Sequence, residues 1–375
     1  MTERPLRVLH AYRTYFPDTQ GGAEELIRQI CQNVAPHGVE SRIYALSPRP
    51  APHPQERPEG RLYQVKRTFE VASCGVGLGG LRAFRRLARW ADVLHLHFPW
   101  PWGDVLALAA GEDRPLVVTY HSDIVRQRLL GKLYAPLGRR LLARAARVVA
   151  TSPQYAARSA VLRALGERVV VIPAGLDPAH LPRPDPAQVA TLRERYGDPF
   201  FFFVGVFRYY KGLTWLVRAA AELPASVVIA GAGPDEAALR AEAARLGLDN
   251  VHFPGAIDDA DKMAHLAACR AFVLPSHLPA ESFGMALLEA AHCGKPLVTC
   301  EIGTGTSFVN VHGETGLVVP PADPTALAAA LRRLADDPEL ARRLGENARR
   351  RFAELFSGAA LGRHYAELYR EVAGR

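Results

Sequence analysis

The chain has 375 residues, of which 49% are hydrophobic and 8% aromatic. This length exceeds what one hydrophobic core usually organises, so we expect two domains, and the composition excludes a disordered or fibrous protein. No apolar run is long enough to span a membrane, and the first residues lead directly into an expected strand, so we expect a cytoplasmic protein. Residues 1–180 hold 25 Lys or Arg and 15 Asp or Glu, whereas the remainder holds 21 and 23. This imbalance predicts an anionic partner on the first half alone.

The cysteines have neither the spacing of a zinc site nor that of a redox pair, which favours buried, reduced thiols. The five positions are Cys31, Cys74, Cys269, Cys293 and Cys300.

In the first half, apolar runs typical of strands alternate with helical stretches, a pattern that predicts a parallel α/β sheet. The expected strands cover residues 6–11, 41–46, 61–68, 92–97, 116–121, 147–151 and 169–172. Residues 26–35 and 81–90 are expected helices. Residues 47–60 and 75–80 are expected loops, because proline or glycine is frequent in them.

A glycine pair, Gly21 and Gly22, stands between the first strand and the first helix. Glycines at this place allow the backbone to approach a ligand closely, and they begin a helix whose N-terminus points at that ligand. This arrangement is the opening unit of a nucleotide-binding fold. A plain turn is the alternative.

Histidines mark two neighbouring strands. His95 and His97 share one face of the strand 92–97 and would suit a metal pair, but no third ligand stands nearby in the sequence, so we expect no metal site. His121 ends the strand 116–121, at the carboxyl edge where α/β proteins bind their ligands. A buried structural histidine is the alternative.

Residues 126–147 carry seven basic side chains and no acidic one, interleaved with leucines and Tyr134. This composition resembles an interfacial amphipathic helix that binds an anionic lipid surface, and a solvated helix face is the alternative. Pro136 and Gly138 are expected to split the helix in two. A nucleic-acid surface is not expected, because no stacking platform or binding motif accompanies the charge.

Residues 173–185 contain four prolines and are the best candidate for an interdomain linker. The second half then repeats the α/β pattern. Its expected strands cover residues 200–205, 226–233 with a glycine turn, 251–254, 271–274, 296–299 and 316–319. Its expected helices cover residues 213–221, 258–269, 324–335, 338–355 and 361–372.

Two cations, Arg208 and Lys211, lie in the loop before the helix 213–221. The free N–H groups of a helix N-terminus and two cations together make a good pyrophosphate site. Gly231 and Gly233 form the glycine turn after the next strand.

Residues 275–294 lead from the strand 271–274 into a helix that ends at Gly294, with Ser282 as its expected N-cap. Glu281 lies just before this helix, and Glu289 lies about two turns inside it. The helix N-terminus would bind the phosphates of a ligand, while the two carboxylates would bind the hydroxyls of its sugars. The alternative is that both glutamates are solvated surface charges.

Six motifs in this order resemble glycosyltransferase family 4, a retaining family, over nearly the whole chain. They are Gly21-Gly22-Ala23-Glu24, the strand-end His121, the turn Val171–Asp177, the pair Lys211-Gly212, the turn Gly231–Pro234, and Glu281 to Glu289 around Ser282-Phe283-Gly284. The chain departs from the family at Ala174, where Asn or His is usual, and at Val206, where an arginine is usual. Arg208 lies two residues after that position.

The resemblance implies an α/β protein of the GT-B fold, in which two doubly wound, Rossmann-like domains face each other across a cleft. Residues 1–180 would form the acceptor-side domain, and residues 181–355 would form the domain that binds a nucleotide sugar. The C-terminal helix, within residues 356–375, would pack back on the first domain.

By position in the family, Lys211 and Arg208 would hold the pyrophosphate of the donor and stabilise the departing nucleoside diphosphate. Glu281 would hold the donor sugar, and Glu289 would bind the ribose. His121 would contact the sugar or the acceptor near the reacting carbon.

The resemblance implies further substrate-binding positions, among which Phe283 and Gly284 would bind the donor sugar through their backbone and Gly22 would approach the phosphate. These further positions are Gly21 and Gly22 in the first domain, and Gly231, Gly233, Ser282, Phe283, Gly284 and Met285 in the second.

The implied activity is that of a metal-independent hexosyltransferase whose donor is a substrate, so no cofactor is expected. The basic first half suits a glycan or lipid-linked acceptor in bacterial surface-polysaccharide or lipopolysaccharide synthesis, with peripheral attachment to the anionic inner face of the plasma membrane. Residues 303–310 are similar to members that build such glycans, some of which use GDP-mannose.

Two alternatives come from other classes. One is a non-catalytic protein that binds a nucleotide sugar, and the other is a peripheral membrane scaffold that uses residues 126–147. A GT-B epimerase or phosphorylase is a third alternative, although nothing in the sequence indicates the pyridoxal lysine that a phosphorylase needs.

Overall fold

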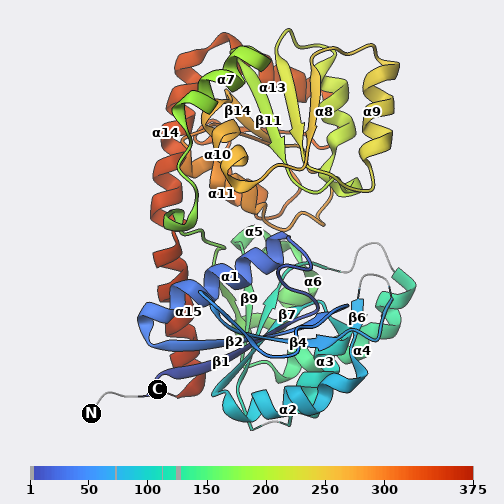
Figure 1. The fold of residues 1–375 in the computed structure, drawn as a ribbon, viewed down its shortest axis with the longest axis vertical. Coiled ribbons are helices and arrows are strands. Elements are labelled where there is room, and N and C mark those ends of the chain that lie inside the picture. The colour runs from blue at the N-terminus through green and yellow to red at the C-terminus, as the bar shows by residue number, and fades with distance from the viewer. Residues whose placement is uncertain (1–3, 72–73, 112, 124–127, 375) are drawn as a thin grey trace. The chain divides into compact units, whose positions relative to one another are not determined.

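The computed structural model (Figure 1) describes residues 4–71, 74–111, 113–123 and 128–374, with side chains from residue 133 onward in the last range. The chain divides into two compact units. Unit 1 comprises Met1–Gly175 and Gly358–Arg375, and unit 2 comprises Leu176–Ser357. The boundaries expected from the sequence, after residues 180 and 355, lie within a few residues of these.

Unit 1 contains an eight-stranded sheet with the order β10-β9-β8-β7-β1-β2-β4-β3. All neighbours are parallel except β3, which is antiparallel to β4. The strands are β1 (Leu6–Tyr12), β2 (Val39–Ser47), β3 (Gln55–Arg57), β4 (Gly60–Lys66), β7 (Val93–Phe98), β8 (Leu116–Tyr120), β9 (Arg147–Ala150) and β10 (Val169–Val171), while β5 (Phe69–Val71) and β6 (Cys74–Val76) form a separate hairpin.

Helices cover both faces of this sheet (Figure 1). They are α1 (Gly22–Val34), α2 (Leu81–Trp90), α3 (Pro101–Ala109), α4 (Arg128–Arg144), α5 (Pro153–Arg158), α6 (Ala160–Leu165) and α15 (Gly358–Ala373), with the short 3-10 helices η1 (Ala35–His37), η2 (Leu78–Gly80) and η3 (Gly166–Arg168). Side chains alternate between the faces along each strand. Leu94 and Leu96 of β7 therefore join the apolar core formed with α2, α3 and α4. His95 lies on the other face, against α15.

Unit 2 contains a six-stranded parallel sheet with the order β13-β12-β11-β14-β15-β16. Its strands are β11 (Phe200–Val204), β12 (Ser226–Ala230), β13 (Val251–Gly255), β14 (Ala271–Leu274), β15 (Leu297–Cys300) and β16 (Gly316–Val319). Its helices are α7 (Pro186–Tyr196), α8 (Leu213–Ala220), α9 (Glu236–Arg245), α10 (Asp259–Ala268), α11 (Met285–His292), α12 (Thr306–Val309), α13 (Pro324–Asp336) and α14 (Pro338–Leu355), with η4 (Pro178–His180) and η5 (Tyr209–Lys211). The strands β11 and β14 are buried throughout apart from the last residue of β11, which explains their unbroken apolar sequences.

Each expected strand is confirmed to within two residues, apart from the glycine turn that follows β12, and the expected helices are also present. The helix α1 begins at Gly22, so the expectation that the glycine pair begins this helix is confirmed. Three local expectations are wrong. The loop 47–60 contains the edge strand β3, and the loop 75–80 contains the end of β6 and η2. The helix α4 continues through Pro136 without a break, while Arg126 of the predicted basic stretch lies outside the described residues.

All five cysteines are free thiols, as expected, although Cys74 and Cys293 are only partly buried. In the described part of the chain, no helix has the length and apolar character that crossing a bilayer requires.

Candidate functional site: a lysine–glutamate pair in unit 2 and a histidine column in unit 1

The predicted cations and carboxylates of unit 2 follow the two central strands of its sheet. The strand β11 lies beside β14, and the chain leaves these two strands in opposite directions across the sheet. Loops at such a reversal of strand order diverge and leave space at the carboxyl edge, where open α/β sheets bind ligands. Lys211 follows β11, and Glu281 follows β14.

The structure brings Lys211 and Glu281 together. Lys211 Nζ lies 2.5 Å from Glu281 Oε2, and the two side chains are only 15% and 10% exposed. The Ser276 hydroxyl donates a second hydrogen bond to Glu281 Oε2, at 3.1 Å. Burial disfavours the charged form of Lys211, but the nearby Glu281 carboxylate outweighs it and raises the lysine pKa above its usual value. Lys211 therefore stays a cation in this half-buried position.

The helix α11 begins beside this pair, although not where the sequence suggested. The N-cap is Gly284, with φ of 87°, and no side chain caps the helix, so the expected N-cap role of Ser282 is wrong. Gly284 is needed here because its positive φ is unfavourable for other residues, and an added Cβ would lie 2.7 Å from Leu274 Cδ2. The N-cap of the helix therefore lies three residues after Glu281, and the Leu287 N–H donates to the Gly284 carbonyl at 2.9 Å. The N–H groups of Met285 and Ala286 have no acceptor four residues earlier within the helix.

Glu289 is the fifth residue of α11, so it lies about one turn inside the helix rather than two. Its Oε1 accepts a hydrogen bond from Lys262 Nζ at 2.7 Å, and both side chains are 15% exposed. Lys262 also contacts Asp259 at 2.7 Å. Sequence reasoning missed Lys262, because it comes from α10 and meets Glu289 only through the packing of α10 on α11.

The other predicted residues of unit 2 differ in their exposure. Arg208 is exposed, and Ser282 and Met285 are partly buried, whereas Phe283 is buried. Gly231 and Gly233 have a packing reason to be glycine, because a Cβ at either position would lie within 2.4 Å of a backbone oxygen in the loop after β11. These glycines let the loops after β11 and β12 pack closely.

In unit 1, the predicted glycines lie at the start of α1. Gly21 is the N-cap in an extended conformation, Gly22 is the first helical residue, and both are exposed. Glu24 in the first turn is buried and accepts a hydrogen bond from Thr19 Oγ1 at 2.8 Å.

His121, at the end of β8, is the last member of a column of four histidines. His97 Nδ1 lies 3.0 Å from His121 Nε2. His10, from β1, pairs in register with His95 of β7. Burial, with a smaller effect of Arg13, lowers the pKa of His121 to about 4, and burial lowers that of His10 to about 3. Both side chains are therefore neutral at neutral pH.

The expectation that His95 and His97 lack a third partner is wrong, because His10 supplies one from the neighbouring strand. One ring nitrogen from each of the three could lie within 4.8 Å of the others. However, His95 Nδ1 already contacts Tyr369 Oη at 2.7 Å, and His95 Nε2 contacts Thr119 Oγ1 at 2.7 Å. A metal ion would have to displace one of these bonds, so the residues fit a hydrogen-bonded column better than a metal centre.

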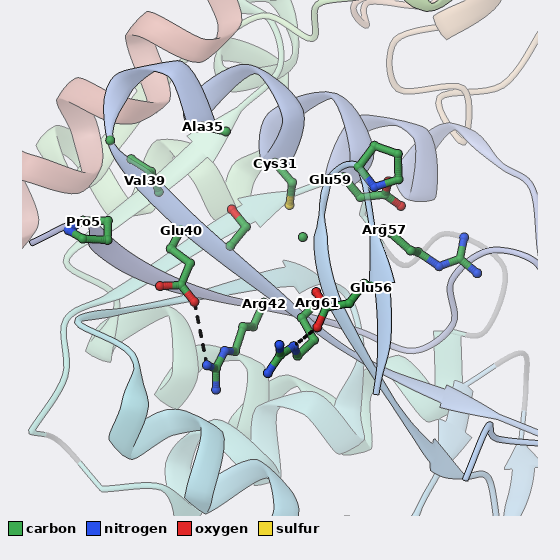
Figure 2. A pocket seen from close by; sticks show the side chains of 14 residues that line it. Pro5, Cys31, Ala35, Val39, Glu40, Arg42, Glu56, Arg57, Glu59 and Arg61 are labelled. Carbon is green, nitrogen blue, oxygen red and sulfur yellow. Dashed lines mark hydrogen bonds and ion pairs between the residues drawn. The ribbon is translucent and has the colours of Figure 1, made fainter. Parts of the chain in front are cut away.

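A separate cavity of about 380 Å³ lies at the opposite, amino-terminal edge of the same sheet (Figure 2). Four of its charged side chains form two pairs, Glu40 with Arg42 at 3.7 Å and Glu56 with Arg61. No residue predicted for the site lines this cavity. We assign it no function.

Comparison with known proteins identifies the family. The family described as Glycosyltransferase Family 4 matches residues 20–180, and the family described as Glycosyl transferases group 1 matches residues 186–351. The chain is 48% identical to the D-rhamnosyltransferase WbpZ of Pseudomonas aeruginosa, over 94% of this chain and 92% of that protein. It is 45% identical to the O-antigen chain mannosyltransferase C of Escherichia coli, over 97% of this chain and 98% of that protein.

Solved structures agree on the fold. The sucrose-phosphate synthase of Thermosynechococcus elongatus superposes with a TM-score of 0.80 at 24% identity, covering 98% of this chain and 99% of that one. The Anabaena protein Alr3699/HepE, solved with UDP and glucose, also has a TM-score of 0.80, at 20% identity, covering 98% of this chain and all of that one. The chain therefore belongs to glycosyltransferase family 4, and it is a hexosyltransferase of the GT-B fold and of the bacterial surface-polysaccharide type.

Proposed function

We propose that this protein transfers a mannosyl or closely related hexosyl residue from a nucleoside-diphosphate sugar, with GDP-mannose as the first candidate, to a hydroxyl group of a lipid-linked glycan. The extensive similarity to a mannosyltransferase and a rhamnosyltransferase supports this sugar class. The observation that carries the proposal is the half-buried Lys211–Glu281 pair at the strand reversal of unit 2.

The diphosphate of the donor would bind between Lys211 and the N-terminus of α11. Both supply positive charge, and the first N–H groups of the helix point toward the anion. Binding would exchange the Glu281 carboxylate for phosphate oxygens at Lys211 Nζ. Glu281 would then be free to accept hydrogen bonds from the hydroxyls of the donor sugar, and Glu289 would accept those of the ribose. Arg208 is exposed in the same loop and would add charge at the rim.

The reaction would break the bond between the anomeric carbon and the phosphate oxygen, whose electron pair stays with the departing nucleoside diphosphate. The acceptor hydroxyl would attack from the same face, and its proton would pass to the departing phosphate oxygen, so that the anomeric configuration is retained. Lys211 and the α11 N–H groups stabilise the negative charge where it develops, which is the most effective place for a catalytic cation. This scheme assigns no step to a metal ion.

Neutral His121 would donate a hydrogen bond to an oxygen of the donor sugar near the reacting carbon. Because its pKa is lowered to about 4, it would act as a dipole rather than as a cation at neutral pH.

The test is a measurement of nucleoside diphosphate release with purified protein and an acceptor. Lys211→Ala and Glu289→Ala should each lower kcat/KM by about 100-fold or more, by analogy with the loss of one oxyanion donor. Arg343→Ala, an exposed change on α14, is the matched control and should leave the rate unchanged. Near-native rates in both site variants, with unchanged thermal unfolding, would refute the proposed donor site.

We also propose that unit 1 attaches the cytoplasmic protein to an anionic membrane surface. Large apolar side chains of this unit are exposed on β5, η2 and α4, with exposed fractions of 48% for Phe69, 58% for Leu78 and 74% for Leu133. Exposed arginines lie on α2, which contacts η2, at Arg82, Arg85, Arg86 and Arg89, and on α4 at Arg139 and Arg140. Apolar side chains flanked by cations are typical of proteins that bind anionic bilayers.

Co-sedimentation with vesicles tests this attachment. The protein should bind vesicles rich in phosphatidylglycerol and not vesicles of phosphatidylcholine alone. Replacing Leu133 and Phe69 together by Ser should lower the bound fraction several-fold, whereas Leu355→Ser, an exposed position on unit 2, should not. Equal binding of all three proteins would exclude this surface.

A further inference from the structure

His121 is held by a second histidine that the proposed reaction does not use. His97 is 1% exposed, and its Nδ1 lies 3.0 Å from His121 Nε2. The backbone beside it is equally constrained, because the His121 N–H donates to the Phe98 carbonyl at 2.9 Å. Thus both the main chain and the ring of His121 are hydrogen-bonded to residues of β7.

Neighbouring rings hold the His97 ring in place. It lies 4.5 Å from the His95 ring and stacks on the His121 ring at 5.2 Å, with Tyr12 edge-on at 6.0 Å. The His95 ring is in turn fixed at both nitrogens, by Tyr369 of α15 and by Thr119 of β8. Because the His97 ring is packed in this way, its orientation is fixed, and it sets the orientation of the His121 ring.

The number of N–H groups available decides whether His97 or His121 donates the hydrogen bond between them. A neutral imidazole has one N–H group and one lone pair. His97 Nε2 is buried and has no hydrogen-bond partner among the described residues. If His97 carried its proton on Nε2, a buried N–H would be orphaned, whereas a proton on Nδ1 leaves only a lone pair unpaired. Orphaned buried N–H groups are the rarer case, so Nδ1–H donates to His121 Nε2.

We propose that His97 is a positioning residue that fixes the tautomer and the ring orientation of His121, so that His121 carries its proton on Nδ1 and presents it to the donor sugar. This inference rests on the proposed function for the role of His121 in the reaction, but the tautomer itself does not. A His121 ring freed from His97 could turn or take the other tautomer, and it would then offer the sugar a lone pair instead of an N–H donor.

Among the described residues, the titratable or charged groups that face His121 are Tyr12 and Arg13 of the β1 segment and His95 and His97 of β7. Arg13 and a donating His97 both disfavour a second proton on His121. Removal of the donor at position 97 should therefore raise the pKa of His121 and shift the acid limb of the kcat/KM profile to higher pH.

The first test needs no substrate. Nitrogen-15 spectra of histidine-labelled full-length protein at neutral pH, assigned with His97 and His121 variants, distinguish protonated from lone-pair ring nitrogens. We expect His121 to be protonated at Nδ1 and His97 at Nδ1. A His121 proton on Nε2, or rapid exchange between tautomers, would overturn the inference even if the enzyme is fully active.

Kinetics provide the second test. His97→Leu removes the donor and should lower kcat roughly 10- to 100-fold, as the loss of orienting partners does for other functional histidines, with little change in the KM of the donor. His97→Asn can place an amide N–H where Nδ1 was, and it should restore most of kcat and the wild-type acid limb. His252→Gln is the matched control, because it removes an imidazole hydrogen bond, to the Ser226 hydroxyl of unit 2, that lies outside the column; it should lower thermal stability only.

Equal loss of activity in His97→Leu and His97→Asn, with no shift of the acid limb, would assign His97 a merely structural role. If the wild-type protein transfers no sugar at all, the proposed function fails, while the spectra still decide the tautomer.

Discussion

Both acidic side chains of the proposed donor site are paired with a lysine, Glu281 with Lys211 and Glu289 with Lys262. Such pairs keep half-buried charges satisfied until a substrate replaces one partner. They also hold the carboxylates in place, which lowers the cost of ordering the site when the donor binds.

Lys262→Ala tests this pre-ordering. The variant loses the ammonium group that contacts Glu289 at 2.7 Å. We expect the donor KM to rise roughly fivefold, corresponding to about 1 kcal/mol, the typical net contribution of one hydrogen bond, with a smaller change in kcat. Asp259→Asn, which alters the other, exposed partner of Lys262, is the control and should stay within about twofold. An unchanged KM in Lys262→Ala would show that Glu289 needs no such support.

The buried histidines of unit 1 predict sensitivity to mild acid. Burial lowers the pKa of His10 to about 3 and those of His95 and His97 well below the usual value. An unfolded chain takes up these protons near pH 6.5, whereas the folded protein does not, so stability is complete above pH 6.5 and is lost as the pH falls below it. Each imidazole costs about 1.4 kcal/mol at pH 5.5, or about 4 kcal/mol for the three.

Denaturant unfolding at pH 7.5 and pH 5.5 measures this loss. His10→Phe should reduce the difference between the two pH values by about 1.4 kcal/mol. His53→Gln, at an exposed position, should leave the difference as it is. A wild-type stability that does not fall between these pH values would contradict the neutral, buried column.

At the residue scale, sequence motifs predicted the site residues that stand at fixed positions in those motifs. They did not predict the residues that contact these positions only in the folded structure. Lys211 and Glu281 belong to motifs and do meet. Lys262 and His10 belong to none, because each reaches its partner only through helix or strand packing. The N-cap was misplaced because a serine ordinarily favours that position, whereas here the close packing on Leu274 requires Gly284.

Among the elements, α15 shows how a helix distant in sequence completes a domain. It packs on α1, and its Gly362 lies so close that an added Cβ would stand 2.0 Å from the Asn33 carbonyl oxygen. Tyr365 and Tyr369 of the same helix enter the histidine column through Thr119 and His95. The amphipathic tail could be predicted as a helix, but its register against α1 depends on a backbone contact that periodicity does not reveal.

Gly362→Ala should therefore separate α15 from α1 and lower the free energy of unfolding of unit 1 by about 1–3 kcal/mol, as overpacking usually does. Gly79→Ala is the matched control, because no atom lies within 4 Å of the Cβ it would add. Chemical denaturation followed by circular dichroism measures both. Equal free energies of unfolding for Gly362→Ala and Gly79→Ala would contradict the close packing of α15 on α1.

The wrong predictions for β3 and α4 also arise because tertiary contacts leave little trace in the sequence. The edge strand β3 is only three residues long and lies in a proline-rich segment, so its pairing with β4 leaves almost no pattern. The helix α4 continues through Pro136 although proline disfavours a helix interior, and it packs on α3.

For the whole molecule, the way in which the chain divides into two α/β units predicts which unit can fold by itself. Unit 2 is one continuous segment, Leu176–Ser357, whereas unit 1 needs the distant segment Gly358–Arg375. A fragment of residues 176–357 should fold cooperatively by itself. Residues 1–175 should fold only when a peptide of residues 358–375 is added, because α1 otherwise exposes the face that α15 covers. Cooperative thermal unfolding of residues 1–175 alone would contradict this division.

The central claim is that Lys211 binds the diphosphate of a nucleotide sugar while Glu281 binds its sugar. Titration calorimetry of the full-length protein tests it most directly, with the donor that a thermal-shift screen of UDP-, GDP-, ADP- and dTDP-sugars selects and with the matching diphosphate without sugar. We predict that Lys211→Ala weakens both ligands by at least about tenfold, as expected for a charged hydrogen bond, whereas Glu281→Gln weakens the nucleotide sugar but not the bare diphosphate. Equal weakening of both ligands by Glu281→Gln, or unchanged binding in Lys211→Ala, would contradict the claim.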